Sequence, residues 1–359
     1  MLMLVNCSGC HTPLQLPTGA TSIRCSLCHA ITRIADPRSA PPPPPYAATS
    51  SSYNNYYPPP PPAPYNHSPP GGQKKAVIIG ISYRNTKNEL KGCINDAKCM
   101  KFMLVNRFKF PESSILMLTD EETDPYRIPT KHNIRMAMFW LVKGCQSGDS
   151  LVFHFSGHGA QQRNYTGDEI DGFDETLCPL DFETQGMIVD NEINASIVRP
   201  LPAGVKLHAI IDACHSGTVL DLPFLCRMDR SGRYAWEDHR PPSGAWKGTS
   251  GGEAISFSGC DDNQTSADTA ALSKVTSTGA MTYAFIQAIE KGQGATYGSI
   301  LNAMRSTIRQ TSEDLVAGGG AVTTLLTMLL TGGSGVGLRQ EPQLSCNERF
   351  DVYMKPFSL

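Results

Sequence analysis

Short apolar runs alternate with amphipathic segments over most of the chain from residue 73 onward. The apolar runs are typical of strands buried on both faces, and they lie at 76–81, 115–118, 151–155, 205–211 and 254–258. The amphipathic segments predict helices at 95–108, 130–145, 279–291 and 297–310. Thr130 can cap the second helix, and a last strand is expected at 350–354. Strands alternating with helices predict an α/β fold, with a mostly parallel β-sheet flanked by helices.

Two segments depart from this pattern. Residues 37–72 are rich in Pro, Tyr, Ser and Asn, and contain proline runs at 41–45 and 58–62. Such a sequence has little to bury and favours extended polyproline II, so we expect a disordered linker; a docking site for a Pro-binding domain is the alternative. Residues 226–252 hold Arg, Pro, Gly and Ser without periodicity, and we expect an exposed basic connection there.

These breaks divide the chain of 359 residues, which is long enough for one sizeable domain with accessory segments. We expect a Cys-rich module at 1–36, the Pro-rich linker at 37–72, a large block at 73–225, the basic connection at 226–252 and a small block at 253–359.

Charge and cysteine usage narrow the possible functions and compartments. The net charge is -2, so there is no basic excess to bind a phosphate backbone, and nucleic acid is not an expected partner. The 12 cysteines are spread along the chain, without a hydrophobic secretory segment before them, which favours a reducing compartment. No apolar run reaches the ~20 residues that span a bilayer. We expect a soluble monomer of the cytoplasm, with the nucleus as a second location.

Two strand candidates end in small-residue turns that each present a reactive side chain. Phe-Ser-Gly-His-Gly at 155–159 presents His158, and Asp-Ala-Cys-His-Ser-Gly at 212–217 presents Cys214. The carboxyl ends of parallel strands meet at one edge of a sheet, so both residues would reach the same surface. A neighbouring imidazole raises the thiolate fraction and can protonate a leaving amine. Either residue alone is more often structural, but together they predict Cys214 as a nucleophile and His158 as its base.

The N-terminal module carries cysteines with the spacing C-x2-C-x14-C-x2-C: Cys7, Cys10, Cys25 and Cys28. This spacing is close to that of a four-thiolate zinc site, in which Zn²⁺ joins two chelating pairs. Because the segment has few apolar residues, the metal would supply its folding energy. His11 and His29 lie beside the pairs, so a mixed Cys/His set is the alternative.

An acidic stretch follows the predicted His158 turn: Asp168, Glu169, Asp171, Asp174, Glu175, Asp181, Asp190 and Glu192. Most acidic runs are solvated faces. Calcium, however, takes six to eight hard oxygens, and carboxylates on separate loops can supply them. Both interpretations remain open from the composition alone.

The two catalytic turns resemble the motif blocks of metacaspases, caspase-related cysteine peptidases, and the likeness extends over residues 75–359. With the zinc module and the Pro-rich linker, the chain is similar to the type I metacaspases of plants. The resemblance implies a caspase-like sheet and an endopeptidase that cleaves after Arg or Lys. A substrate's basic side chain demands carboxylates at the floor of its pocket.

The resemblance also implies particular site residues. The pocket for the basic side chain would use Cys93, Asp96, Ser156 and Asp212, with an auxiliary thiol as the alternative role for Cys93. A calcium site maps onto Asp174, Asp190, Asn191 and Asp221. The family more often has an acid where Asn191 stands, so calcium should bind more weakly here.

The resemblance extends to regulation. The zinc module is similar to the small fingers of plant regulators of lesion-type cell death, which implies partners among such zinc-finger proteins and a role in programmed cell death. Basic residues in 222–252 would make that segment a self-substrate for autoprocessing. The competing hypothesis is a zinc-finger adaptor whose caspase-like domain is silenced.

Overall fold

The structure is a computed structural model that divides into two compact units, Met1–His67 and Ser68–Leu359. It describes residues 3–6, 13–16, 22–25, 30–33, 72–165, 167, 169–170, 172–214, 216–241, 243–259, 280–292, 295–317 and 341–359. Most of the Pro-rich segment lies outside these residues, so its expected disorder stays a prediction. Apart from the segment 226–252, the expected division of the chain likewise stays a prediction.

The N-terminal unit contains two antiparallel strand pairs. β1 (Met3–Asn6) pairs with β2 (Pro13–Leu16), and β3 (Ser22–Arg24) pairs with β4 (Ile31–Arg33). The backbone N–H of Cys25 donates to the carbonyl of Ala30 at 2.9 Å, which extends the second pair by one bond. Each pair is too small to be stable alone in water, in keeping with the expected need for metal.

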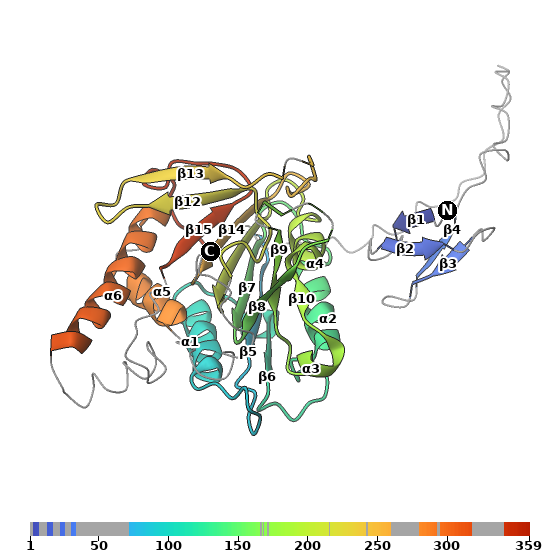
Figure 1. Cartoon of the computed structure of the whole chain (residues 1–359), viewed down its shortest axis with the longest axis horizontal. Coiled ribbons are helices and arrows are strands. Elements are labelled where there is room, and N and C mark those ends of the chain that lie inside the picture. Colours follow the sequence, from blue (N-terminus) through green and yellow to red (C-terminus); the bar gives the residue numbers. More distant parts are fainter. Residues whose placement is uncertain are drawn as a thin grey trace, which may run out of the picture. The chain divides into compact units, whose positions relative to one another are not determined.

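The second unit is built on an eight-stranded sheet with the order β13-β12-β15-β14-β11-β7-β5-β6 (Figure 1). Its parallel part comprises β5 (Lys74–Gly80), β6 (Ile115–Thr119), β7 (Ser150–Ser156), β11 (Lys206–Asp212) and β14 (Glu253–Ser258). Its antiparallel edge comprises β12 (Phe224–Met228), β13 (Tyr234–Asp238) and β15 (Gln343–Cys346). The five apolar runs identified in the sequence are the five parallel strands, so the predicted α/β fold is confirmed.

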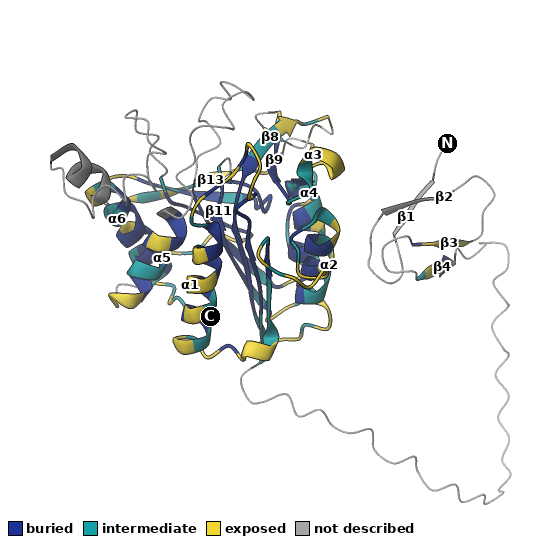
Figure 2. Ribbon diagram, turned by 90° about the horizontal axis from the view of Figure 1, so that it is seen from below, coloured by how far each residue is buried: buried dark blue, intermediate teal, exposed yellow. Residues whose placement is uncertain are grey.

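Helices cover both faces of this sheet. One face carries α1 (Cys93–Asn106), α5 (Ala280–Glu290) and α6 (Tyr297–Ala317); the other carries α2 (Lys131–Val142), α4 (Asp190–Ile193) and a π-helical turn, Asn194–Val198 (Figure 1). Along β5 the side chains alternate between the two cores: Val77 packs toward α2 and Ile78 toward α1. Buried residues therefore fill most of the parallel strands, and exposed residues lie on the outer helix faces (Figure 2). The cap at Thr130 is confirmed, since its side chain accepts from the N–H of Asn133.

A second, three-stranded antiparallel sheet leaves the main sheet directly after β7. Its order is β10-β9-β8, with β8 at Gly159–Arg163, β9 at Phe173–Leu177 and β10 at Ile188–Val189. The short helix α3 (Phe182–Gln185) and a 3₁₀ turn, Glu112–Ser114, complete the described elements. This small sheet carries the acidic stretch to the carboxyl ends of the parallel strands.

Two expectations about the chain are wrong. The segment 226–252 is not an exposed connection throughout, because β12 and β13 within it form a hairpin on the main sheet and Cys226 is 1% exposed. The last strand is Gln343–Cys346, whereas 350–354 forms a turn. Among the described residues, no helix combines the length and apolar character needed to cross a membrane.

Candidate active site

The expected catalytic residues lie at adjacent strand ends. β7 and β11 are hydrogen-bonded in parallel, with Ser156 opposite Asp212, and His158 and Cys214 each follow two residues later. Gly159 passes so near the Cys214 turn that a Cβ built on it would lie 2.1 Å from the Cys214 carbonyl oxygen. Only glycine allows this approach, which keeps the two turns together.

The His158 ring is buried and held at one nitrogen. Its Nε2 lies 2.8 Å from the carbonyl oxygen of Asn88, which can only accept, so Nε2 carries the hydrogen. Nδ1 is also buried and has no hydrogen-bond partner among the described residues. Burial lowers the pKa of His158 below its usual value, which keeps the ring neutral. The neutral ring thus offers Nδ1 as a proton acceptor.

Tyr83 holds both the backbone and the ring of His158 in place. Its hydroxyl donates to the Cys178 carbonyl at 2.6 Å and accepts from the His158 N–H at 3.0 Å, and its ring lies 4.7 Å from the imidazole between centroids. Tyr83 has a φ of 49°, a left-handed conformation that a bulky residue seldom adopts. Backbone strain of this kind is maintained only where the surrounding contacts determine it.

Two carboxyl groups lie at the strand ends that lead into the catalytic turns. Asp96, in the first turn of α1, accepts from the Ser156 hydroxyl at 2.9 Å, and Asp212 accepts from the N–H of Thr282 in the first turn of α5 at 2.7 Å. Burial, together with the nearby Asp212, raises the pKa of Asp96 to about 8. The first turn of α5 thus supplies a hydrogen-bond donor to Asp212, whereas burial favours the neutral form of Asp96 at neutral pH.

The fourth expected pocket residue, Cys93, begins α1 and is fully buried in the core. Its carbonyl lies so close to Gly80 that a Cβ there would meet it at 2.6 Å. A fully buried thiol is usually inert, so the burial argues against an auxiliary nucleophile at Cys93.

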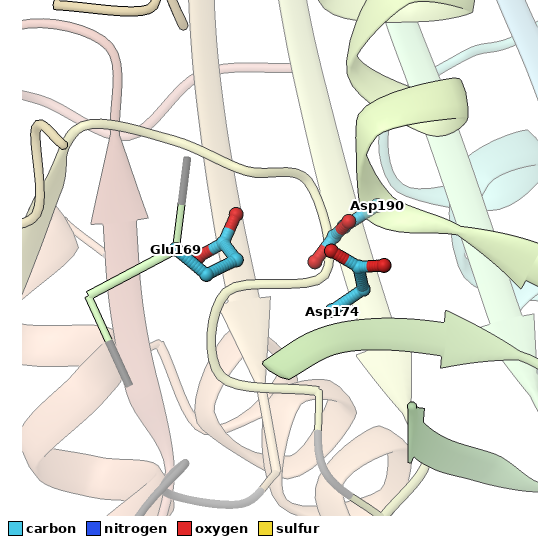
Figure 3. Close-up of side chains that lie close together, drawn as sticks. All are labelled: Glu169, Asp174 and Asp190. Atoms are coloured by element: carbon cyan, nitrogen blue, oxygen red, sulfur yellow. The ribbon is translucent and has the colours of Figure 1, made fainter. Parts of the chain in front are cut away.

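Three residues of the acidic stretch gather into one cluster, whereas Asp181 and Glu192 lie elsewhere. One oxygen from each of Glu169, Asp174 and Asp190 lies within 4.8 Å of the others (Figure 3). Burial and the neighbouring carboxylates raise the pKa of Asp190 to about 10, and burial raises that of Glu169 to about 8. Calcium–oxygen bonds of 2.3–2.6 Å place ligands at most about 5 Å apart, so this all-oxygen set fits a hard cation.

The other two expected calcium residues lie beside this cluster. The Asn191 N–H donates to Asp190 Oδ1 at 2.6 Å, and Asp221 forms an ion pair with Lys247. Glu169, which lay in the acidic stretch but outside the expected calcium set, is brought in by the fold. Asp168 and Asp171 lie outside the described residues.

Among the expected zinc residues, Cys25 is described and buried. Cys7, Cys10 and Cys28, with the neighbouring His11 and His29, lie outside the described residues, so the metal geometry of this module stays a prediction.

The sequence analysis missed Tyr83, the Asn88 carbonyl, Thr282 and Lys247. Tyr83 and Asn88 lie in the loop after β5, where no periodic pattern points to them. Asn88 acts through its backbone carbonyl, which every residue type has, so its identity gives no signal. Lys247 falls in the segment that was expected to be exposed, yet its side chain is 4% exposed.

The site combines a buried, neutral imidazole, whose Nδ1 can accept a proton, with a thiol at the end of the neighbouring strand and two nearby carboxyl groups. This arrangement is typical of a cysteine hydrolase. Comparisons with known proteins agree. Residues 74–223 match the metacaspase, peptidase C14 domain, and residues 7–31 match the LSD1 zinc finger.

Full-length relatives narrow the class to one family. The chain is 71% identical to Metacaspase-1 of Arabidopsis thaliana, over 99% of this chain and 96% of the relative. It is 60% identical to Metacaspase-2 of the same plant over 100% of both chains, and 38% identical to Metacaspase-1 of Eremothecium gossypii over 78% of this chain and 65% of that one. The chain therefore belongs to the metacaspases and is a cysteine endopeptidase with a caspase-like fold; its LSD1 zinc finger implies bound zinc.

Tyr83→Phe tests the support of His158. The change keeps the ring contact but removes the hydroxyl that bonds both His158 and Cys178, so the imidazole should lose its fixed orientation. We expect kcat/KM to fall about tenfold, the equivalent of one buried hydrogen bond, with KM nearly unchanged.

The matched control is Tyr126→Phe, since Tyr126 is 82% exposed and should leave the kinetics unchanged. The acid limb of the pH profile should also move in Tyr83→Phe alone. An unaltered profile and rate would show that Tyr83 serves only to pack the core.

Proposed function

We propose that Cys214 is the nucleophile of this metacaspase and that Nδ1 of His158 is its base. The single observation that carries this proposal is the bond from His158 Nε2 to the Asn88 carbonyl, which leaves Nδ1 as the acceptor at the strand end beside Cys214.

The chemistry follows from these positions. The Cys214 thiol gives its proton to His158 Nδ1, and the thiolate attacks the carbonyl carbon of the scissile peptide bond. Backbone N–H groups of the Cys214 turn stabilise the oxyanion, and the leaving amine takes the proton from His158. Water then hydrolyses the thioester, with His158 again as the base. The lowered pKa of His158 keeps the base unprotonated at neutral pH.

Cys214→Ala should abolish hydrolysis of a peptide reporter that ends in Arg, because the other described thiols near this strand end, Cys93 and Cys178, are buried and therefore inert. Cys99→Ala is the matched control, since Cys99 is exposed on α1 and should leave the rate unchanged. Undiminished hydrolysis by Cys214→Ala would instead favour the adaptor hypothesis, in which the caspase-like domain is silent.

We further propose cleavage after Arg or Lys, with Asp96 and Asp212 receiving the basic side chain and Ser156 and Cys93 shaping the pocket. The support is the pair of buried acids below the catalytic turns, one of which is held protonated by burial and by its neighbour. A substrate guanidinium would favour the charged form of Asp96 and so release its proton.

Asp96→Asn tests this pocket. Removing one acid should lower kcat/KM for Arg substrates by about 100-fold or more, in line with the cost of breaking a buried ion pair. In the unchanged protein, KM should rise as the pH falls below about 8, because protons compete with the guanidinium for Asp96. That pH dependence should vanish in Asp96→Asn and persist in the surface control Asp124→Asn. Equal loss for Arg and for uncharged substrates would contradict the assignment.

We propose that the acidic cluster binds activating calcium, with Glu169, Asp174 and Asp190 as the residues that would hold it. Asp221 and Asn191 lie next to these three. The bound ion would supply positive charge that offsets the crowding of these carboxylates. Calcium should therefore raise peptide hydrolysis, and residues 73–359 should respond more than the full chain if the N-terminal segment inhibits.

Calcium should also trigger autoprocessing within 222–252, where Arg227, Arg230 and Arg233 lie on or beside the β12–β13 hairpin. Mass spectrometry of the chain before and after calcium addition measures this. If only intact chain is found while the peptide reporter is hydrolysed, self-cleavage is excluded. The assignment of Cys214 and His158 as catalytic residues is then unaffected.

Finally, we propose that the zinc module recruits zinc-finger regulators of cell death and that the enzyme acts in the cytoplasm during programmed cell death. The support is the LSD1 zinc-finger match, and the net charge of -2 gives no basic excess for binding nucleic acid. Association of the full chain with such a regulator, lost in Cys10→Ser, is the measurement that bears on it.

A further inference from the structure

Lys247 lies inside the acidic cluster. Its side chain is 4% exposed, its ammonium is 2.7 Å from Glu169 Oε1, and it also pairs with Asp221. Lysine is almost never buried to this degree unless its charge is paired. The segment that carries it joins β13 to β14, so this cation reaches the cluster from a distant part of the chain.

The cluster has more acid than Lys247 can neutralise. Lys247 pairs with Glu169 and Asp221, whereas Asp174 and Asp190, whose oxygens converge with those of Glu169, form no ion pair among the described residues. Carboxylates held this close together repel one another unless positive charge balances them. A divalent cation would relieve the crowding more fully than one ammonium does.

Glu169 takes part in two arrangements that compete. It accepts from Lys247, and it is also one of the three residues whose oxygens converge to within 4.8 Å. A divalent ion on those oxygens would face the Lys247 ammonium only a few ångströms away in a buried setting, where like charges repel strongly. The two cations therefore exclude each other.

We propose that Lys247 is a built-in counter-ion, which holds the acidic cluster in the metal-free chain and which a divalent cation must displace. This inference rests on the proposed calcium site. It adds that calcium binding there displaces the Lys247 ammonium.

The exchange reaches the catalytic loop through Asp221 and Asn194. The Asn194 amide donates to the carbonyls of Leu220, Asp221 and Lys247, at 3.0, 3.1 and 3.3 Å, so it ties the Lys247 segment to the loop that begins at Cys214. Asp221 is held at a φ of 54° while it pairs with Lys247. Loss of that ion pair removes one of the contacts that keep Asp221 in this strained conformation.

Calorimetric titration of the full chain with calcium tests the exchange, in a Cys214→Ala background that prevents self-cleavage. Lys247→Met should bind calcium about tenfold more tightly or better, a change of about 1.4 kcal/mol. Lys247→Arg, which keeps the charge, should bind no more tightly than the parent. Lys143→Met, at an exposed lysine, is the matched control and should not change the affinity.

A second measurement separates displacement from simple removal of a charge. Amine acetylation of the parent, followed by mass spectrometry, should leave Lys247 almost unmodified without calcium and modify it extensively with calcium. Acetylation of Lys143 should be the same in both conditions.

The outcomes distinguish the two proposals. Calcium binding to the parent, with Lys247 protected throughout, would overturn the exchange and leave the calcium site standing. Equal affinity of the parent and Lys247→Met would do the same. No calcium binding by the parent or by Lys247→Met would overturn the calcium site and the exchange together, whereas binding by Lys247→Met alone would support the exchange.

Discussion

The parallel register of β7 with β11 is the constraint on which the rest of this site depends. It sets Ser156 opposite Asp212, so that the two residues ending the strands lie side by side at the proposed pocket, and the residues two positions later supply the imidazole and the thiol. A shift of one residue would turn each of these side chains to the other face of the sheet. The buried apolar side chains of both strands, which pack against helices on either face, exclude that shift.

Several acidic side chains lie at the carboxyl ends of the parallel strands, and three different interactions stabilise them. Asp212 accepts from the N–H of Thr282 in the first turn of α5, burial keeps Asp96 protonated, and Glu169 pairs with the ammonium of Lys247. Each arrangement leaves an acid that a cation could further stabilise. In an enzyme proposed to receive a basic side chain and a calcium ion, these acids are the structural basis of both affinities.

The strands of the parallel sheet were predictable because a strand buried on both faces must be apolar almost throughout. The hairpin of β12 and β13 was not, because it lies at the sheet edge and mixes buried with polar positions. Arg227 and Glu237, for example, pair across the two strands and look like surface loop residues in the sequence. The turn at 350–354 was taken for a strand because Phe350 and Val352 alternate with polar residues, yet both pack against the aromatic core around Tyr297.

The sequence alone determined the chemical groups: a thiol and an imidazole in glycine-bracketed turns, the paired cysteines of the zinc module, and a stretch rich in carboxylates. These groups can be recognised from the sequence because each motif is local and its residue types are sufficient to indicate its chemistry. Only the tertiary structure decided how these groups are held and balanced. Tyr83 and Asn88 reach His158 across 75 and 70 positions, and Lys247 reaches Glu169 across 78. Contacts over such distances depend on how the strands and loops pack. Burial then raises the pKa of Asp96, Glu169 and Asp190, which no local pattern records.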